Sequence, residues 1–253
     1  MTMKKRIVVL SGAGISAESG ISTFRDSDGL WEKHDVMEVA SATGFARNPE
    51  LVHRFYNQRR AQLLEVSPNS AHIGLAELEK DFDVNIITQN VDDLHERAGS
   101  TNVLHLHGEL MKVRSVTDES KVFTLTADNI ATTPETEIEG HKVRPHIVFF
   151  EEAVPNIHRA VELMRVADIC VIVGTSLTVQ PAASLYRFLP RKAPIYYIDP
   201  RPVVPYDRDV DLLTIVNMEN NSFYVVINPI PDKLISNGTI EGFVEFVNSR
   251  RDR

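Results

Sequence analysis

Short apolar runs alternate with segments of helical spacing along most of this 253-residue chain. Runs of β-branched and aliphatic residues predict strands at Ile7–Leu10, Val84–Thr88, Val103–Leu106, Ile147–Phe150, Ile169–Val173 and Ile195–Ile198. Apolar residues three and four positions apart predict a helix that starts within Ile15–Gly20, and further helices over Asn48–Val66, Ser70–Lys80, Ile157–Arg165, Ala182–Leu189 and Glu241–Ser249. This alternation is typical of an α/β fold, in which a mostly parallel sheet carries helices on both faces.

The segment Lys112–Lys142 departs from this pattern. It is rich in Thr, Glu and Asp, and it has one short apolar patch, Val122–Leu125. This composition predicts a small hairpin-like insertion with flexible loops rather than another strand–helix unit.

Polar clusters follow several of the predicted strands directly. They are Gly12-Ala13-Gly14, Gln89-Asn90, His107-Gly108 and Gly174-Thr175-Ser176. In parallel α/β sheets, ligands bind outside the carboxyl ends of the strands. We therefore expect these clusters to converge on one site, and their convergence is a stronger signal than any single cluster.

Two of the candidate phosphate-binding features have plain structural alternatives. Gly12 and Gly14 would let a phosphate approach the start of a helix, or they would form an ordinary tight turn. Ala17 stands where a full dinucleotide motif has its last small residue, usually Gly. Arg25, after Phe24, could pair with a phosphate or lie in a solvated loop.

The remaining clusters suggest polar recognition and acid–base chemistry. Gln89, Asn90 and Asp92 could bind an amide or ribose hydroxyls, or Asn90 could cap a helix. His107 is a candidate general base, and alternation along the strand puts His105 on the same face. A histidine in this place can also be purely structural. A metal bound by the pair would need further ligands that the sequence does not reveal.

Composition narrows the possible functions. The net charge is −8, which disfavours a role in coating nucleic acid but suits a cationic peptide substrate. A single cysteine, Cys170, excludes an internal disulfide and a cysteine-rich zinc site. The first apolar run is too short for a signal peptide, and no window suits a membrane span. We therefore expect a cytoplasmic protein with no membrane association.

Six stretches together resemble the sirtuins, the NAD-dependent protein deacylases. They are GAGISAESGI (12–21), TFRDSDGLW (23–31), TQNVDDLHERAG (88–99), HLHGEL (105–110), VRPHIVFF (143–150) and GTSLTVQPAA (174–183), in the order of that family. The resemblance implies one catalytic domain over 1–253. Its Rossmann-like core would carry small-module insertions at about 24–70 and 111–143.

The resemblance also implies roles for individual residues. His107 matches the catalytic base of the family. Residues matching the NAD site are Gly12, Ala13, Gly14, Glu18, Ser19, Phe24, Arg25, Gln89, Asn90, Asp92, Gly174, Thr175, Ser176 and Asp199. The acyl-lysine protein or peptide would run along Val148, Phe149 and Phe150. The reaction would release free lysine, nicotinamide and O-acyl-ADP-ribose.

A further match concerns the acyl group. Tyr56 and Arg59 have the Tyr-x-x-Arg spacing of the sirtuin subgroup that accepts negatively charged acyl groups such as succinyl and malonyl. Residues at i and i+3 share a helix face, and a hydroxyl with a guanidinium can bind a carboxylate. The alternative is an Arg-rich surface face, since Arg54 and Arg60 are near.

Three departures from the family pattern affect these expectations. The small module has no cysteines, so it is expected to fold without zinc or to be loosely ordered. Glu151 replaces the Gly of a Phe-Gly-Glu segment and could crowd or recharge the peptide groove. Asp199 replaces a common Asn. Rival functions on this scaffold are NAD hydrolysis, ADP-ribosyl transfer, and an ADP-ribose or NAD sensor.

Overall fold

The computed structural model describes residues 3–21, 30–31, 34–199, 214–216 and 224–228. Within this part, a seven-stranded sheet has the order β12-β13-β11-β10-β1-β4-β5. Its strands are β1 (Arg6–Ser11), β4 (Asp83–Thr88), β5 (Val103–His105), β10 (Ile169–Val173), β11 (Ile195–Asp199), β12 (Thr214–Val216) and β13 (Tyr224–Asn228). The pairs among β11, β10, β1, β4 and β5 are parallel, whereas β13 and β12 add an antiparallel edge.

The register brings the carboxyl ends of four strands to one level. Ser11, the last residue of β1, pairs with Val173 of β10 and with Thr88 of β4. Thr88 in turn pairs with His105, the last residue of β5. The predicted convergence of the polar clusters is therefore confirmed, since each begins one or two residues beyond these strand ends.

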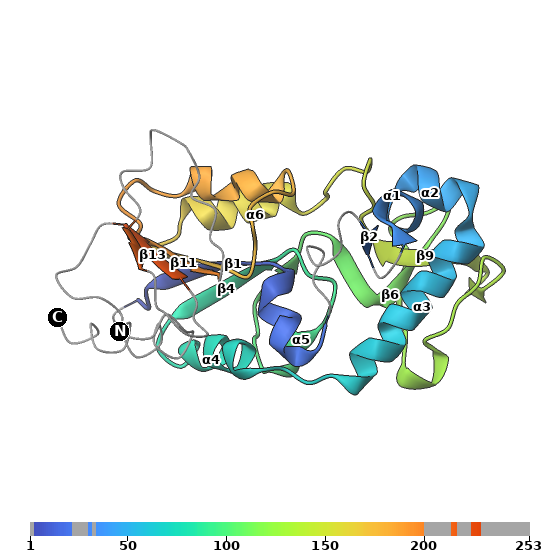
Figure 1. Cartoon of the computed structure of the whole chain (residues 1–253), viewed down its shortest axis with the longest axis horizontal. Coiled ribbons are helices and arrows are strands. Elements are labelled where there is room, and N and C mark those ends of the chain that lie inside the picture. The colour runs from blue at the N-terminus through green and yellow to red at the C-terminus, as the bar shows by residue number, and fades with distance from the viewer. Residues whose placement is uncertain (1–2, 22–29, 32–33, 200–213, 217–223, 229–253) are drawn as a thin grey trace.

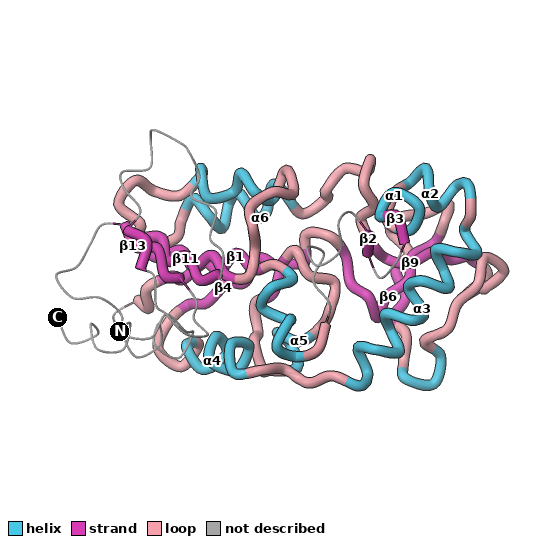
Figure 2. The backbone as a smooth tube through the Cα atoms, in the orientation of Figure 1, coloured by secondary structure: helices cyan, strands magenta, loops and turns pink. Residues whose placement is uncertain are grey.

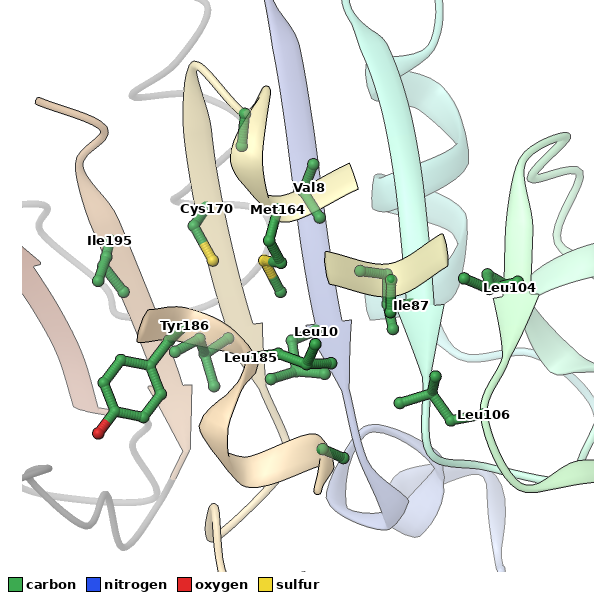
Figure 3. Packing of buried hydrophobic residues seen from close by; sticks show 14 of the residues in the cluster. Val8, Leu10, Ile87, Leu104, Leu106, Met164, Cys170, Leu185, Tyr186 and Ile195 are labelled. Atoms are coloured by element: carbon green, nitrogen blue, oxygen red, sulfur yellow. The ribbon is translucent and has the colours of Figure 1, made fainter. Parts of the chain in front are cut away.

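Apolar layers cover both faces of the sheet, which confirms the predicted α/β class. One face packs against α4 (Ser70–Leu78) through Leu75 and Leu78. The other packs against α6 (Ile157–Arg165) and the 3-10 helix η3 (Ala182–Phe188). Figure 1 shows α4 and α6 on opposite sides of the sheet, and Figure 3 shows side chains of the second layer.

A second group of elements stands beside the carboxyl edge of the sheet (Figure 2). Its helices are α1 (Val36–Val39), α2 (Ala42–Arg47), α3 (Pro49–Glu65) and the 3-10 helix η2 (Ala127–Asn129). Its strands are β6 (Gly108–Ser115), β7 (Val122–Thr124), β8 (Glu137–Ile138) and β9 (His141–Ile147), in the order β7-β6-β9-β8. A two-stranded ribbon, β2 (Leu30–Trp31) with β3 (His34–Asp35), precedes α1. Short helices η1 (Ala13–Ser19) and α5 (Leu94–Arg97) follow β1 and β4.

Several expectations about elements were wrong in detail. The strand predicted over 147–150 ends at Ile147 and belongs to the antiparallel sheet, because Val148 and Phe150 bond to other partners. The helices expected near 15–20 and over 182–189 are 3-10 helices, in which residues at i and i+3 also share a face. The 112–142 insertion forms most of the four-stranded sheet rather than a lone hairpin. The helix expected over 241–249 lies outside the described residues.

The insertion packs on a small apolar core and a buried arginine. Val113, Leu125 and Val143 form the core. Arg60 of α3 is fully buried, and its Nε donates to the Leu110 carbonyl of β6 over 2.8 Å. Its Nη1 donates to the Asn57 side chain, the Ile130 carbonyl and the Thr132 hydroxyl. The alternative of an Arg-rich surface face is therefore wrong for Arg60, although Arg54 is exposed.

Within the described residues, no group of three or more His, Cys, Asp or Glu side chains could hold a metal ion. The Arg60 guanidinium links α3 to Leu110, just before the insertion, and to Ile130 and Thr132 within it. Burial lowers the pKa of Arg60 to about 10, so the group stays charged at neutral pH.

Arg60→Met should destabilise the fold by about 3 kcal/mol, because it leaves buried carbonyl and hydroxyl groups without their donor. Urea unfolding followed by circular dichroism measures the loss. The matched control is Arg54→Met on the exposed side of the same helix, which should stay within about 0.5 kcal/mol of the unsubstituted chain. Equal stabilities for the two variants would contradict this role of Arg60.

Candidate active site

Two loops meet at the carboxyl edge of β1 and β10. The Gly14 N–H donates to the Gly174 carbonyl over 2.8 Å, and the Gly12 N–H donates to the Val173 carbonyl over 3.1 Å. Gly174 has φ +61°, and a Cβ there would lie 2.2 Å from the Ile15 nitrogen. The glycines are therefore required for this close loop-to-loop contact.

Ser16 connects the first loop to the segment after β4. It is fully buried, accepts a hydrogen bond from Asn90 Nδ2 at 3.0 Å and donates one to Asp92 Oδ2 at 3.1 Å. Burial raises the pKa of Asp92 against the opposing effect of its bonds from the Leu94 N–H and Ser16. Asn90 does not cap a helix, since the N-cap of α5 is Asp93. Ser16 lies within the GAGISAESGI stretch, but the family resemblance gave it no role.

Gln89 ties the same segment to the other loop. Its backbone N–H donates to the Ser11 carbonyl over 2.9 Å. Its side-chain Nε2 donates to Thr175 Oγ1 over 2.9 Å. The predicted cofactor residues Gln89, Asn90, Asp92 and Thr175 therefore gather around one edge, together with Ser16.

His107 is held in one tautomer. Its Nδ1 lies 3.0 Å from the Gln89 carbonyl oxygen, which can only accept a hydrogen bond. Nδ1 therefore carries the proton, and the neutral ring keeps a lone pair on Nε2. Burial lowers the pKa of His107, while the bond to Gln89 opposes this shift. A neutral, oriented imidazole at the edge of the site has the properties of a general base.

His105 has a structural role. Its Nδ1 lies 2.9 Å from the Asn90 carbonyl, and its Nε2 lies 2.8 Å from Glu96 Oε1. Both nitrogens face acceptors, so the ring is a cation. Burial, the largest single effect, lowers the pKa of His105, but the hydrogen bond and charge of Glu96, the bond to the Asn90 carbonyl and the charge of Glu109 together raise it. The two histidines thus have different protonation states although the sequence presents them alike.

The other predicted NAD-site residues are more peripheral. Ser19 accepts a hydrogen bond from Asn69 Nδ2 at 3.1 Å, and Glu18 is exposed. Ser176 pairs with Thr178 near the surface, and Asp199 is buried at the end of β11. Phe24 and Arg25 lie outside the described residues.

The predicted acyl pocket adjoins this edge. Arg59 and Asp92 line one small cavity of about 40 Å³, together with Ile21, Gln62, Leu63, Val91 and Leu110. Tyr56 is only 1% exposed, and burial raises the pKa of its hydroxyl. Arg59 stacks over the Phe55 ring, with 5.6 Å between the guanidinium carbon and the ring centroid.

The predicted peptide-binding segment lies directly beside the base. The Val148 N–H donates to the His107 carbonyl over 2.9 Å. The Phe149 side chain is buried against Tyr56 and under Arg144, so it anchors the segment. Phe150 is 39% exposed and presents its side chain at the surface.

Comparison with known proteins establishes the family of the chain. The Sir2 family profile matches residues 12–181, about two thirds of the chain. The chain belongs to the Sir2 family. The resemblance seen in the sequence is confirmed, and so is the fold class.

Individual relatives of this Sir2 family member carry informative names. An NAD-dependent protein deacylase of Helicobacter pylori is 59% identical over 198 residues, which covers 78% of this chain and 85% of that protein. A solved Sir2 homologue–NAD complex is 43% identical with a TM-score of 0.70, covering 78% and 79% of the two chains. A Sir2 mutant solved with a p53 peptide and NAD is 31% identical with a TM-score of 0.67, covering 82% and 86%.

Three buried histidines of this Sir2 family member were not singled out from the sequence. His95 Nε2 lies 3.0 Å from Ser11 Oγ, and its ring contacts His72 with 4.9 Å between centroids. His53 of α3 bonds to Thr132. Burial, the largest effect for each, lowers the pKa of His53 and His72 to about 4 and that of His95 to about 3.

These histidines make stability depend on pH. Each stays neutral in the fold but takes up a proton at about pH 6.5 when unfolded, so their contribution is complete above pH 6.5 and is lost as the pH falls towards 4. The free energy of unfolding, measured in urea from pH 7.5 to 5, should fall with decreasing pH. His53→Gln should reduce this slope by up to ~1.4 kcal/mol per pH unit. The control is the exposed His158→Gln, which should leave the slope unchanged. An unchanged slope in His53→Gln as well would contradict the role of His53 in the pH dependence of stability.

Proposed function

We propose that this chain is an NAD-dependent protein-lysine deacylase that releases nicotinamide and O-acyl-ADP-ribose. The observation that carries the proposal is the neutral His107, whose Nδ1–H is fixed by Gln89 beside the buried Ser16–Asn90–Asp92 cluster. Its relatives are NAD-dependent deacylases by name. Sequence reasoning leads us to expect this activity in the cytoplasm.

The donors and acceptors at this edge fit NAD. A buried carboxylate and amide, Asp92 and Asn90, suit the nicotinamide amide and ribose hydroxyls. The loops at 12–14 and 174–176 would contact the phosphates and the adenosine half, with Glu18, Ser19 and Asp199 nearby. Phe24 and Arg25 would cover the nicotinamide end. When bound, NAD supplies a ribose carbon that accepts the acyl oxygen as nicotinamide departs.

The chain itself contributes position, exclusion of water and one proton transfer. In this proposal, His107 Nε2 takes the proton of a ribose hydroxyl, and Gln89 stabilises the resulting imidazolium through the Nδ1–H bond. The Val148–His107 bond keeps the peptide-binding segment at a constant distance from the base. No metal takes part in this scheme.

His107→Ala should lower acyl removal by about 100-fold or more while NAD binding persists. Mass spectrometry of products from NAD with acetyl-lysine peptide measures turnover, and calorimetry measures binding. The control is the exposed His158→Ala, which should behave like the unsubstituted chain. In the unsubstituted chain, consumption of NAD without formation of O-acyl-ADP-ribose would favour the hydrolase alternative, and NAD binding without any turnover would favour the sensor.

We further propose that succinyl and malonyl groups are accepted beside Arg59. The support is that Arg59 and Asp92 line one cavity, so an acyl carboxylate near Arg59 would sit next to the candidate nicotinamide pocket. Tyr56, one helical turn away, is buried among Phe55 and Phe149 and could add a hydrogen bond.

Arg59→Met should depress desuccinylation by about 30-fold or more and leave deacetylation nearly unchanged, because it removes the cation that pairs with the acyl carboxylate. The ratio of kcat/KM for succinyl and acetyl forms of one peptide measures this. Tyr56→Phe should shift the ratio in the same direction but less, since it removes one neutral hydrogen bond. Arg54→Met on the same helix is the control. An equal effect of Arg59→Met on both substrates would refute the acyl preference but not the deacylase assignment.

A further inference from the structure

The backbone after β9 is fastened to two neighbouring segments. On one side, Val148 bonds to the His107 carbonyl. On the other, the Phe150 N–H donates to the Ala40 carbonyl over 2.8 Å, and the Ala42 N–H donates to the Phe150 carbonyl over 3.1 Å. This isolated bridge leads into α2. The segment therefore lies between the candidate base and the start of α2.

Glu151, the next residue, has an unusual backbone. Its φ of +75° lies in the left-handed region, which glycine adopts freely but other L-residues do not. Such strain persists only where surrounding contacts over-determine the conformation.

The Glu151 side chain provides the compensating contacts. Its Oε2 accepts a hydrogen bond from the Thr43 N–H over 2.9 Å and another from the Thr43 hydroxyl over 2.8 Å. These bonds also keep the pKa of Glu151 below its usual range, so the carboxylate is ionised at neutral pH. Charge-assisted hydrogen bonds are the stronger kind.

Glu151 in effect extends the backbone bridge by one residue. Phe150 bonds to Ala40 and Ala42, and Glu151 bonds to the following residue, Thr43. The carboxylate is therefore directed back onto α2. A glycine at 151 would remove the strain but would also remove this attachment.

We propose that Glu151 is a positioning residue, which fixes the segment Val148–Phe150 against α2. An acyl-lysine peptide would then bind to a segment whose backbone is already in place. The inference rests on the proposed function, in which this segment contacts the substrate. The residue acts on peptide binding and not on the chemical step, because among the described residues its carboxylate accepts hydrogen bonds from Thr43 and not from His107 or the Ser16 cluster.

Steady-state kinetics with acetyl-lysine peptide at saturating NAD test the proposal. Glu151→Gly should raise the KM for peptide about fivefold, and kcat and the KM for NAD should stay within about twofold. Glu151→Gln should keep the peptide KM of the unsubstituted chain, since the amide oxygen of Gln can still accept both hydrogen bonds from Thr43. Thr43→Val should raise it less, because the bond from the backbone N–H remains.

Glu139→Gly provides the matched control. Glu139 is also an exposed glutamate with positive φ, +52°, but it lies in the β8–β9 turn. Its substitution should leave the peptide KM unchanged. An unchanged peptide KM in both Glu151→Gly and Thr43→Val would overturn the proposal, and so would a loss confined to kcat.

A failure of this inference can be told apart from a folding defect and from a failure of the proposed function. Thr43→Val leaves the backbone at 151 untouched, so it tests the contact even where substitution of Glu151 lowers the melting temperature. If the unsubstituted chain forms no O-acyl-ADP-ribose from any acyl-peptide, the proposed function fails, and this inference fails with it.

Discussion

The carbonyl groups of Gln89 and Asn90 determine what the two neighbouring histidines can do. The Gln89 carbonyl accepts from His107 Nδ1, and the Asn90 carbonyl accepts from His105 Nδ1. Because His105 also meets Glu96, it is a cation, whereas His107 keeps a lone pair on Nε2. The carbonyls of two consecutive residues thus give one histidine a structural role and leave the other as a candidate base.

The two carbonyls can act in this way only if the Gln89–Asn90 segment is itself held in place. The Gln89 side chain and backbone bond to Thr175 and Ser11, and the Asn90 side chain bonds to Ser16. Gly108, next to the base, has φ +88°, and a Cβ there would lie 2.0 Å from the His146 carbonyl oxygen. The base, the candidate NAD edge and the peptide segment are therefore parts of one hydrogen-bonded unit, and a shift in any of them would move His107.

The sequence revealed those features that are repeated or local. Apolar runs located the strands, and polar residues just beyond them located the site. The spacing from Tyr56 singled out Arg59, but the sequence could not show that Arg60 is buried while Arg54 is exposed, because these environments depend on packing against the insertion. Nothing in the sequence distinguished Ser16 from the nearby Ser19, because its partner Asn90 lies 74 residues away. From the sequence, Glu151 is expected to crowd or recharge the peptide groove. Its stabilising partner, Thr43, lies 108 residues away, so no local pattern reveals the contact.

The ¹⁵N chemical shifts of the His107 imidazole test the central claim most directly. They can be assigned by comparison with the His107→Ala variant and followed as the pH is varied. The structure predicts a neutral ring at pH 7 with the proton on Nδ1, an unprotonated Nε2, and a pKa below the ordinary 6.5. A ring that is charged at pH 7, or that carries its proton on Nε2, would contradict the account.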